Sequence, residues 1–151
     1  GAATFTAGTT NLGMNSGILL TTGSANLAIG PNSSASDGDC HNVTSSFNDP
    51  DLSAIEPLAT YDGCVLQFDI VPVCSTLQIH YVFASEEYPE FVGAGYNDAF
   101  GFFVTGPNPS GGNYTNTNIA VLPGTSTFVG IDNVNATTNS SYYINVFSRK
   151  R

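Results

Sequence analysis

Lysine and arginine are absent from residues 1–148, and the chain carries its three such residues at positions 149–151. All twelve aspartate and glutamate side chains therefore lie in a stretch without a Lys or Arg partner of its own. Carboxylates that folding brings together there repel one another unless backbone N–H groups or a bound hard cation relieve the repulsion. A formal net charge of −9 also makes the surface repel nucleic acid and anionic lipid, so neither is an expected partner.

Tryptophan is absent too, and no apolar run approaches the roughly 18 residues of a membrane-spanning helix, so we expect no membrane insertion. The chain has no G-x-S-x-G, no H-E-x-x-H and no phosphate-binding loop. Glu86, Glu87 and Glu90 are the only candidates for a pair of glycosidase carboxylates, but there is no basic residue to tune them. We therefore predict that the protein is not an enzyme.

Cysteine is scarce and odd in number, at Cys40, Cys64 and Cys74. None forms a C-x-x-C pair, so structural zinc is not expected, and one disulfide plus one unpaired cysteine is the simpler interpretation. Which two would pair stays open. The chain begins at Gly1 without Met, which indicates either removal of a signal peptide or a fragment.

The composition favours an extracellular all-β protein. Thr, Tyr, Phe, Val and Ile together with frequent Gly and Pro are typical of strands joined by turns. Few lysines and many Thr and Asn indicate a secreted or surface-exposed chain, and glycosylation is an open question at five N-x-S/T sequons: Asn32, Asn42, Asn113, Asn135 and Asn139.

Alternation of apolar and polar residues predicts where the strands lie. We expect a single domain over residues 1–148 and a basic tail at residues 149–151. The predicted architecture is a β-sandwich of jelly-roll type, with a long polar loop around residues 31–62 and a short helical turn near Asp51. The clearest predicted strands are residues 64–70, 77–83, 99–104, 119–122, 127–131 and 143–147.

An acidic loop lies between two of these predicted strands, from Ser85 to Asp98. Carboxylate and amide oxygens at the exit of one strand and the entrance of the next converge if both strands belong to one sandwich, and such oxygens are the ligands that Ca²⁺ prefers. The alternative is a solvated loop whose glutamates face water. The predicted calcium ligands are Glu86, Glu87, Asn97 and Asp98, joined by Asp49 or Asp51.

The two D-x-D pairs by themselves are weaker signals. Asp49-Pro50-Asp51 starts like an EF-hand loop, but Ala54 stands where that loop needs Gly and Thr60 where it needs Glu. Asp37-Gly38-Asp39 fails the same test. Either pair could complete a calcium site or simply form a turn.

Several segments together resemble the choice-of-anchor L family, and the most specific is Tyr81 to Phe103, with S-E-E-Y-P-E-F followed by N-D-A-F-G-F-F. The family consists of bacterial extracellular domains in surface proteins that carry varied C-terminal anchoring signals, so the resemblance implies a surface location. Family members continue with further strands past residues 142–143. The chain is then either truncated or completed by strands of another chain. The other matching segments are residues 17–23, 49–52, 60–69, 118–125 and 131–135.

Two function classes follow from these observations. The first is a calcium-stabilised structural or adhesive module of a bacterial surface or matrix, which associates with copies of itself through an open sheet edge and builds a filament. The second is a calcium-dependent carbohydrate-binding module that takes surface polysaccharide. Its candidate stacking residues are Tyr88, Phe91, Tyr96 and Tyr114.

Overall fold

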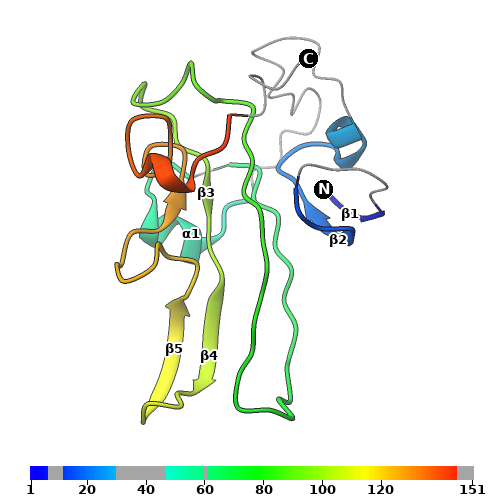
Figure 1. The fold of residues 1–151 in the computed structure, drawn as a ribbon, viewed down its shortest axis with the longest axis vertical. Coiled ribbons are helices and arrows are strands. Elements are labelled where there is room, and N and C mark those ends of the chain that lie inside the picture. The colour runs from blue at the N-terminus through cyan, green and yellow to red at the C-terminus, as the bar shows by residue number, and fades with distance from the viewer. Residues whose placement is uncertain (7–11, 30–46, 60, 146–151) are drawn as a thin grey trace. The chain divides into compact units, whose positions relative to one another are not determined.

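A computed structural model describes residues 1–6, 12–29, 47–59 and 61–145 (Figure 1). The chain divides into two compact units. The first comprises residues 1–49 and 60–84, and the second comprises residues 50–59 and 85–151. The long predicted loop at residues 31–62 falls largely outside the described residues, as does the basic tail at residues 149–151.

The first unit contains an antiparallel pair of strands, β1 (Ala2–Thr6) and β2 (Ser16–Leu20), followed by the 3-10 helix η1 (Ala25–Ile29). The register sets Ala2 opposite Leu20 and Phe5 opposite Gly17. A Cβ at position 17 would lie 2.9 Å from the Phe5 ring, so the glycine allows this ring to lie across the sheet.

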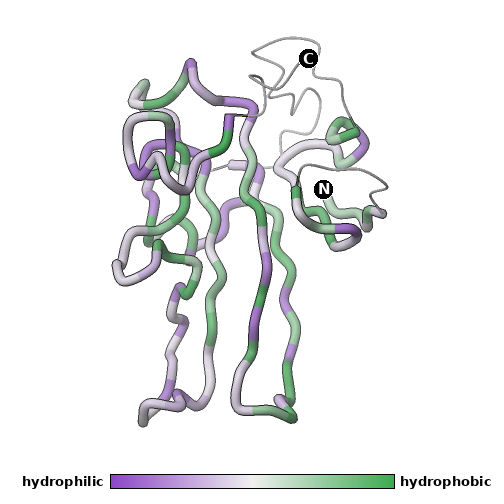
Figure 2. Tube along the Cα trace, in the orientation of Figure 1, coloured by the Kyte–Doolittle hydropathy of each residue, from purple (hydrophilic) through white to green (hydrophobic). Residues whose placement is uncertain are grey.

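Residues 61–84, also in the first unit, contain no strand. The prediction of strands at residues 64–70 and 77–83 is therefore wrong for this structure: both segments run extended without a ladder, and the chain bends at residues 73–75. Hydrophobic and hydrophilic positions alternate along them as the sequence analysis noted (Figure 2). No strand of the described residues pairs with them, and many of their apolar side chains are exposed, among them Val65, Leu66, Phe68, Ile70, Val71, Val73, Leu77, Ile79 and Tyr81.

The second unit begins with the helix α1 (Pro50–Ile55), which confirms the predicted helical turn near Asp51. Proline suits the first turn of a helix because its missing N–H has no intrahelical acceptor there. Four short strands and the 3-10 helix η2 (Ser140–Tyr142) follow. The strands are β3 (Ala99–Phe100), β4 (Phe103–Pro107), β5 (Asn113–Asn118) and β6 (Val129–Gly130).

These strands pair antiparallel as β3 with β6 and β4 with β5. The predicted strand at residues 99–104 is broken after Phe100, because the Asn118 side chain, and not a neighbouring strand, accepts the Phe102 N–H at 3.0 Å. Residues 119–122 keep only a bridge between Val121 and Phe128, and residues 143–145 form no strand. Positions 146 and 147 of that last predicted strand lie outside the described residues.

The buried apolar side chains of the described residues all belong to the second unit: Ala120, Leu122, Val129, Ile131 and Val134. The segments after β5 and around β6 supply them. An all-β class with little helix is confirmed, since the described part has one six-residue α-helix and short strands. The sandwich, its jelly-roll topology and the single domain over residues 1–148 stay predictions. None of the described helices has the length and apolar character to cross a membrane.

Candidate functional site

The acidic loop lies in the second unit between residue 85 and β3. Residues 86–95 form consecutive turns, in which Phe91 N–H bonds Glu87 O at 3.0 Å and Ala94 N–H bonds Phe91 O at 3.0 Å. Gly93 and Gly95 have φ values of 72° and 87°, which side-chain-bearing residues seldom adopt. The loop therefore has a defined backbone that returns its acidic residues towards the start of β3.

Asp132 connects this loop to the segment that follows β6. Its Oδ1 accepts the Gly93 N–H at 2.6 Å, and its own N–H donates to Asn97 Oδ1 at 3.3 Å. The Tyr88 hydroxyl donates to Val134 O. The pairing of β3 with β6 makes these bonds possible, because Ile131 N–H bonds Asp98 O at 3.2 Å beside the ladder.

Glu87 interacts electrostatically with two other carboxylates of the site, Asp98 and Asp132. Its N–H donates to Ser85 Oγ at 3.1 Å, and the same hydroxyl donates to Asp98 Oδ2 at 2.6 Å. The Oε2 atom of Glu87 is buried and has no hydrogen-bond partner among the described residues. Burial, then the charges of Asp98 and Asp132, raise the pKa of Glu87 above its ordinary value of 4.5. Glu87, Asp98 and Asp132, called the acidic cluster below, therefore repel one another when ionised.

Tyr88 borders the acidic cluster and stays protonated at physiological pH. Burial, the neighbouring Tyr143 and the charges of Asp98 and Asp132 raise the pKa of Tyr88 to about 12. The Tyr88 and Tyr143 rings lie with centroids 5.0 Å apart. The neutral Tyr88 hydroxyl donates its hydrogen bond to Val134 O.

A side-chain network around Asn135 holds the segment that carries Asp132. Asn135 is 3% exposed, and its Nδ2 donates to Ile131 O and Asp132 O at 3.0 and 3.1 Å. Its Oδ1 accepts from Thr137 N, Thr137 Oγ1 and Thr138 N at 3.0, 2.9 and 2.8 Å. The buried side-chain amide of Asn135 thus makes the hydrogen bonds that hold this turn, in place of those of a helix or sheet.

Of the six predicted calcium ligands, Glu87 and Asp98 are linked through Ser85, whereas Asn97 makes its hydrogen bonds elsewhere. Asn97 is buried, and its Nδ2 donates to Glu56 Oε2 at 2.6 Å while its Oδ1 faces the Asp132 N–H. Glu86, by contrast, is exposed at the start of the loop.

The D-x-D pair at residues 49–51 is divided between the two units. Asp51, on α1, accepts a hydrogen bond from Asn116 Nδ2 on β5 at 2.6 Å. Asp49 belongs to the first unit, and the other pair, Asp37 and Asp39, lies outside the described residues.

As they lie, no three His, Cys, Asp or Glu side chains in the described ranges converge closely enough to hold a metal ion. The calcium-ligand assignment therefore stays a prediction. The sequence analysis missed Asp132, although the chain has no other carboxylate after Asp98. Its place beside Glu87 depends on the pairing of β3 with β6, which residue patterns do not specify.

The four aromatic residues considered for carbohydrate stacking do not make a single exposed row. Tyr88, Phe91 and Tyr114 are only partly exposed, and Tyr96 is exposed. Phe91 meets the Tyr96 ring edge-on, with centroids 5.7 Å apart and planes at 87°. An edge-on pair presents less flat surface to a sugar ring than a stacked platform would.

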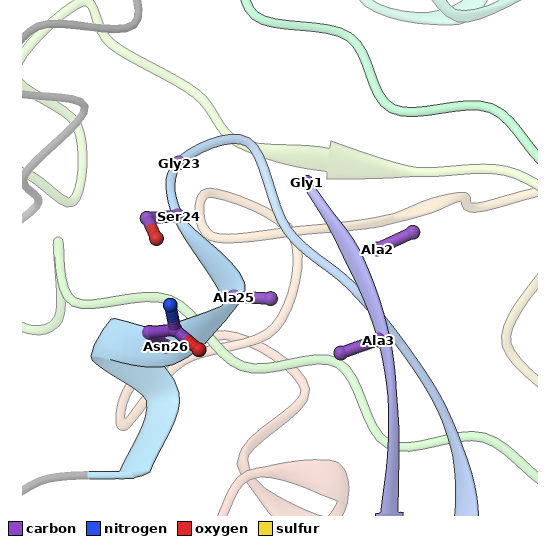
Figure 3. A pocket seen from close by; sticks show the side chains of 7 residues that line it. All are labelled: Gly1, Ala2, Ala3, Gly23, Ser24, Ala25 and Asn26. Carbon is purple, nitrogen blue, oxygen red and sulfur yellow. The ribbon is translucent and has the colours of Figure 1, made fainter.

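An open pocket in the first unit offers little chemistry (Figure 3). It lies between the start of β1 and the turn that leads into η1, and small side chains and backbone line it. No carboxylate, cysteine or histidine contributes to its wall, so the acidic cluster remains the candidate site. The lining residues are Gly1, Ala2, Ala3, Gly23, Ser24, Ala25 and Asn26.

Comparison with known proteins identifies a family that the chain matches. Residues 1–150 match the profile described as Choice-of-anchor L domain. No curated protein and no solved structure shows a significant match. The match spans nearly the whole chain and agrees with the resemblance noted in the segment from Tyr81 to Phe103. The chain therefore belongs to the choice-of-anchor L family, which makes it an extracellular module of a bacterial cell surface.

Proposed function

We propose that this domain is a non-catalytic structural or adhesive module of a bacterial surface, stabilised by calcium at the acidic cluster. The observation that carries the proposal is the acidic cluster itself. Three carboxylates interact there, and one of them has a buried oxygen that no other described residue hydrogen-bonds. Residues 1–148 hold no Lys or Arg to neutralise them. A bound cation would turn this repulsion into attraction.

The chemistry of the cluster favours Ca²⁺ over other cations. Glu87, Asp98 and Asp132 supply carboxylate oxygens, and Ser85 adds a hydroxyl. Ca²⁺ accepts six to eight oxygens in flexible geometry, whereas Mg²⁺ demands a near-ideal octahedron and Zn²⁺ prefers nitrogen and sulfur. Since no three acidic side chains in the described ranges converge as they lie, calcium must draw them together, and flexible coordination suits that adjustment.

Calcium binding would act on stability through the loop junction. Gly93 and Tyr88 already tie the acidic loop to the segment that carries Asp132 and Val134. A cation shared by Glu87 and Asp132 would close the same junction more strongly. Ligand binding to the native state alone adds about 2.7 kcal/mol to the free energy of unfolding at a hundredfold excess over Kd.

The test is thermal unfolding with calcium and with a chelator, in the wild type and in single-charge variants. Glu87→Gln, Asp98→Asn and Asp132→Asn should each reduce the calcium-dependent rise in melting temperature. Glu90→Gln is the matched control, because Glu90 is an exposed carboxylate of the same loop outside the cluster. An equal effect of calcium on all four variants would contradict the proposed site.

Catalysis is not part of the proposed function. The choice-of-anchor L family is a surface structural module, and the raised pKa of Glu87 has a sufficient cause in burial and neighbouring carboxylates. Hydrolysis of a polysaccharide that disappears in Glu87→Gln or Glu86→Gln, with the fold intact, would overturn this part of the proposal.

Self-association is the remaining part of the proposed function. The described strands form only two-stranded sheets, and the edge of a sheet is a place where a strand of another chain can pair. Strand addition from a neighbour in a constant sense would build a filament. Light scattering at micromolar concentration with calcium tests this, since a monodisperse monomer would rule assembly out.

A carbohydrate-binding module is the alternative function, and the exposed ring of Tyr96 is the observation in its favour. Binding to surface polysaccharide that Tyr96→Ala abolishes would support it. Unchanged binding in that variant would remove Tyr96 from consideration.

A further inference from the structure

Three of the five N-x-S/T sequons lie in the described residues, and their asparagine side chains differ in exposure and in hydrogen bonding. Asn113, Asn135 and Asn139 lie in the described residues, whereas Asn32 and Asn42 do not. We propose that Asn113 is an acceptor site for an N-linked oligosaccharide on the folded, exported chain. The proposal is independent of calcium binding.

The modification joins the amide nitrogen of asparagine to a sugar. Nδ2 attacks the anomeric carbon of a lipid-linked oligosaccharide. The bond from that carbon to the lipid diphosphate breaks, and the amide loses one proton. The acceptor amide must therefore be exposed and free of competing hydrogen bonds, and the hydroxyl two residues on must be accessible as well.

Asn113 meets these conditions. It is the first residue of β5, directly after the turn at residues 108–112, and it lies opposite Pro107 on β4. The β4–β5 hairpin is a long ribbon that has this turn at its end (Figure 1). Asn113 and Thr115 are both exposed, and neither side chain forms a hydrogen bond with another described residue.

The turn before Asn113 is held by its own bonds, so a glycan there need not disturb the hairpin. Asn108 N–H donates to Gly112 O at 3.0 Å, Gly111 N–H returns to Asn108 O at 2.9 Å, and Ser110 N–H bonds Asn108 Oδ1 at 2.8 Å. None of these contacts uses the Asn113 side chain. A bulky, solvated sugar on an exposed strand end displaces no packed group.

The other two sequons differ in this respect. The Asn135 amide is 3% exposed and makes the network that fixes Asp132, so a glycan on it would break the fold. Asn139 is exposed, but its Nδ2 donates to Asn133 O at 2.8 Å, and modification would cost that bond. Asn113 is thus the free acceptor among the three.

The test is secretion of the full chain from a host that carries an oligosaccharyltransferase, followed by peptide N-glycosidase in ¹⁸O-water and peptide mass mapping. Each formerly glycosylated asparagine then becomes a labelled aspartate. We expect the label at Asn113 and none at Asn135 in the folded, secreted protein. Thr115→Ala should remove the label from Asn113, and Thr115→Ser should retain it.

Unlabelled Asn113 in wild-type protein that melts cooperatively would overturn the proposal. Label retained at Asn113 in Thr115→Ala would also overturn it, because recognition would then not depend on the sequon. Asn113→Gln serves as the second variant: its melting temperature after deglycosylation should equal that of the wild type, since the side chain has no partner to lose among the described residues.

Discussion

Glu87→Gln should stabilise the protein in chelator and weaken its response to calcium. The substitution removes one of three mutually repelling charges while preserving the size of the side chain. It also replaces a carboxylate whose buried Oε2 has no partner within the described ranges by an amide that can donate to Asp98 or Asp132. This variant is informative because we expect it to gain stability in chelator and to lose stabilisation by calcium.

The expected magnitude follows from the buried oxygen. An unsatisfied buried polar atom costs about 1–3 kcal/mol, and the partial exposure of Glu87 places the gain near the lower end, at about 1 kcal/mol. For a chain of this length, about 1 kcal/mol corresponds to roughly 2–4 °C in melting temperature. With calcium in hundredfold excess, the wild type gains up to about 2.7 kcal/mol, most of which the variant should lose.

The pH dependence of the difference has a definite direction. Because the folded protein raises the pKa of Glu87, ionisation of this group costs stability as the pH rises from 4.5 through the raised value. Glu87→Gln does not titrate, so its advantage in chelator should be present at pH 7 and should vanish below pH 4.5.

Circular dichroism melts at pH 7 and at about pH 4, with Glu90→Gln as control, measure this difference. A Glu87→Gln protein that is less stable than the wild type in chelator, or that keeps the full calcium response, would refute the reasoning.

Two further substitutions test how Asp132 is positioned. Asn135→Ala should lower the free energy of unfolding by about 3 kcal/mol or more in urea titrations, because it removes a buried amide and leaves several backbone groups unpaired; a loss below about 1 kcal/mol would show that the network contributes little. Gly130→Ala should cost about 1–3 kcal/mol and reduce the calcium response, because a Cβ there would lie 2.9 Å from Asp98 O across the β3–β6 pair. Wild-type stability in Gly130→Ala would contradict that close approach.

Local chemistry was readable from the sequence where a short segment determines its own structure. The helical turn near Asp51 was predicted from Asp51 as an N-cap, and the helix forms, but it begins one residue earlier, at Pro50. The meeting of Glu87 with Asp98 follows from a short loop that joins residue 85 to β3, and the Ser85 hydroxyl completes it.

What the sequence could not provide depends on pairing between distant segments. Asp132 reaches the acidic loop because β6 pairs with β3, and alternation of residue types does not state which strands pair. The break in residues 99–104 depends on the Asn118 side chain, which competes with a strand for the Phe102 N–H. Alternation in residues 64–83 predicted strands, but a strand also requires a partner, and no strand in the described part of the chain pairs with those residues.

Isothermal titration calorimetry tests the central claim most directly. Calcium is titrated into the wild type and, in parallel, into the Asp132→Asn variant. The account predicts saturable binding to the wild type, a matching rise in melting temperature, and a clear loss of both in Asp132→Asn with little change in Glu90→Gln. Absence of heat and identical melting temperatures with calcium and with chelator in the wild type would contradict the claim that calcium neutralises the acidic cluster.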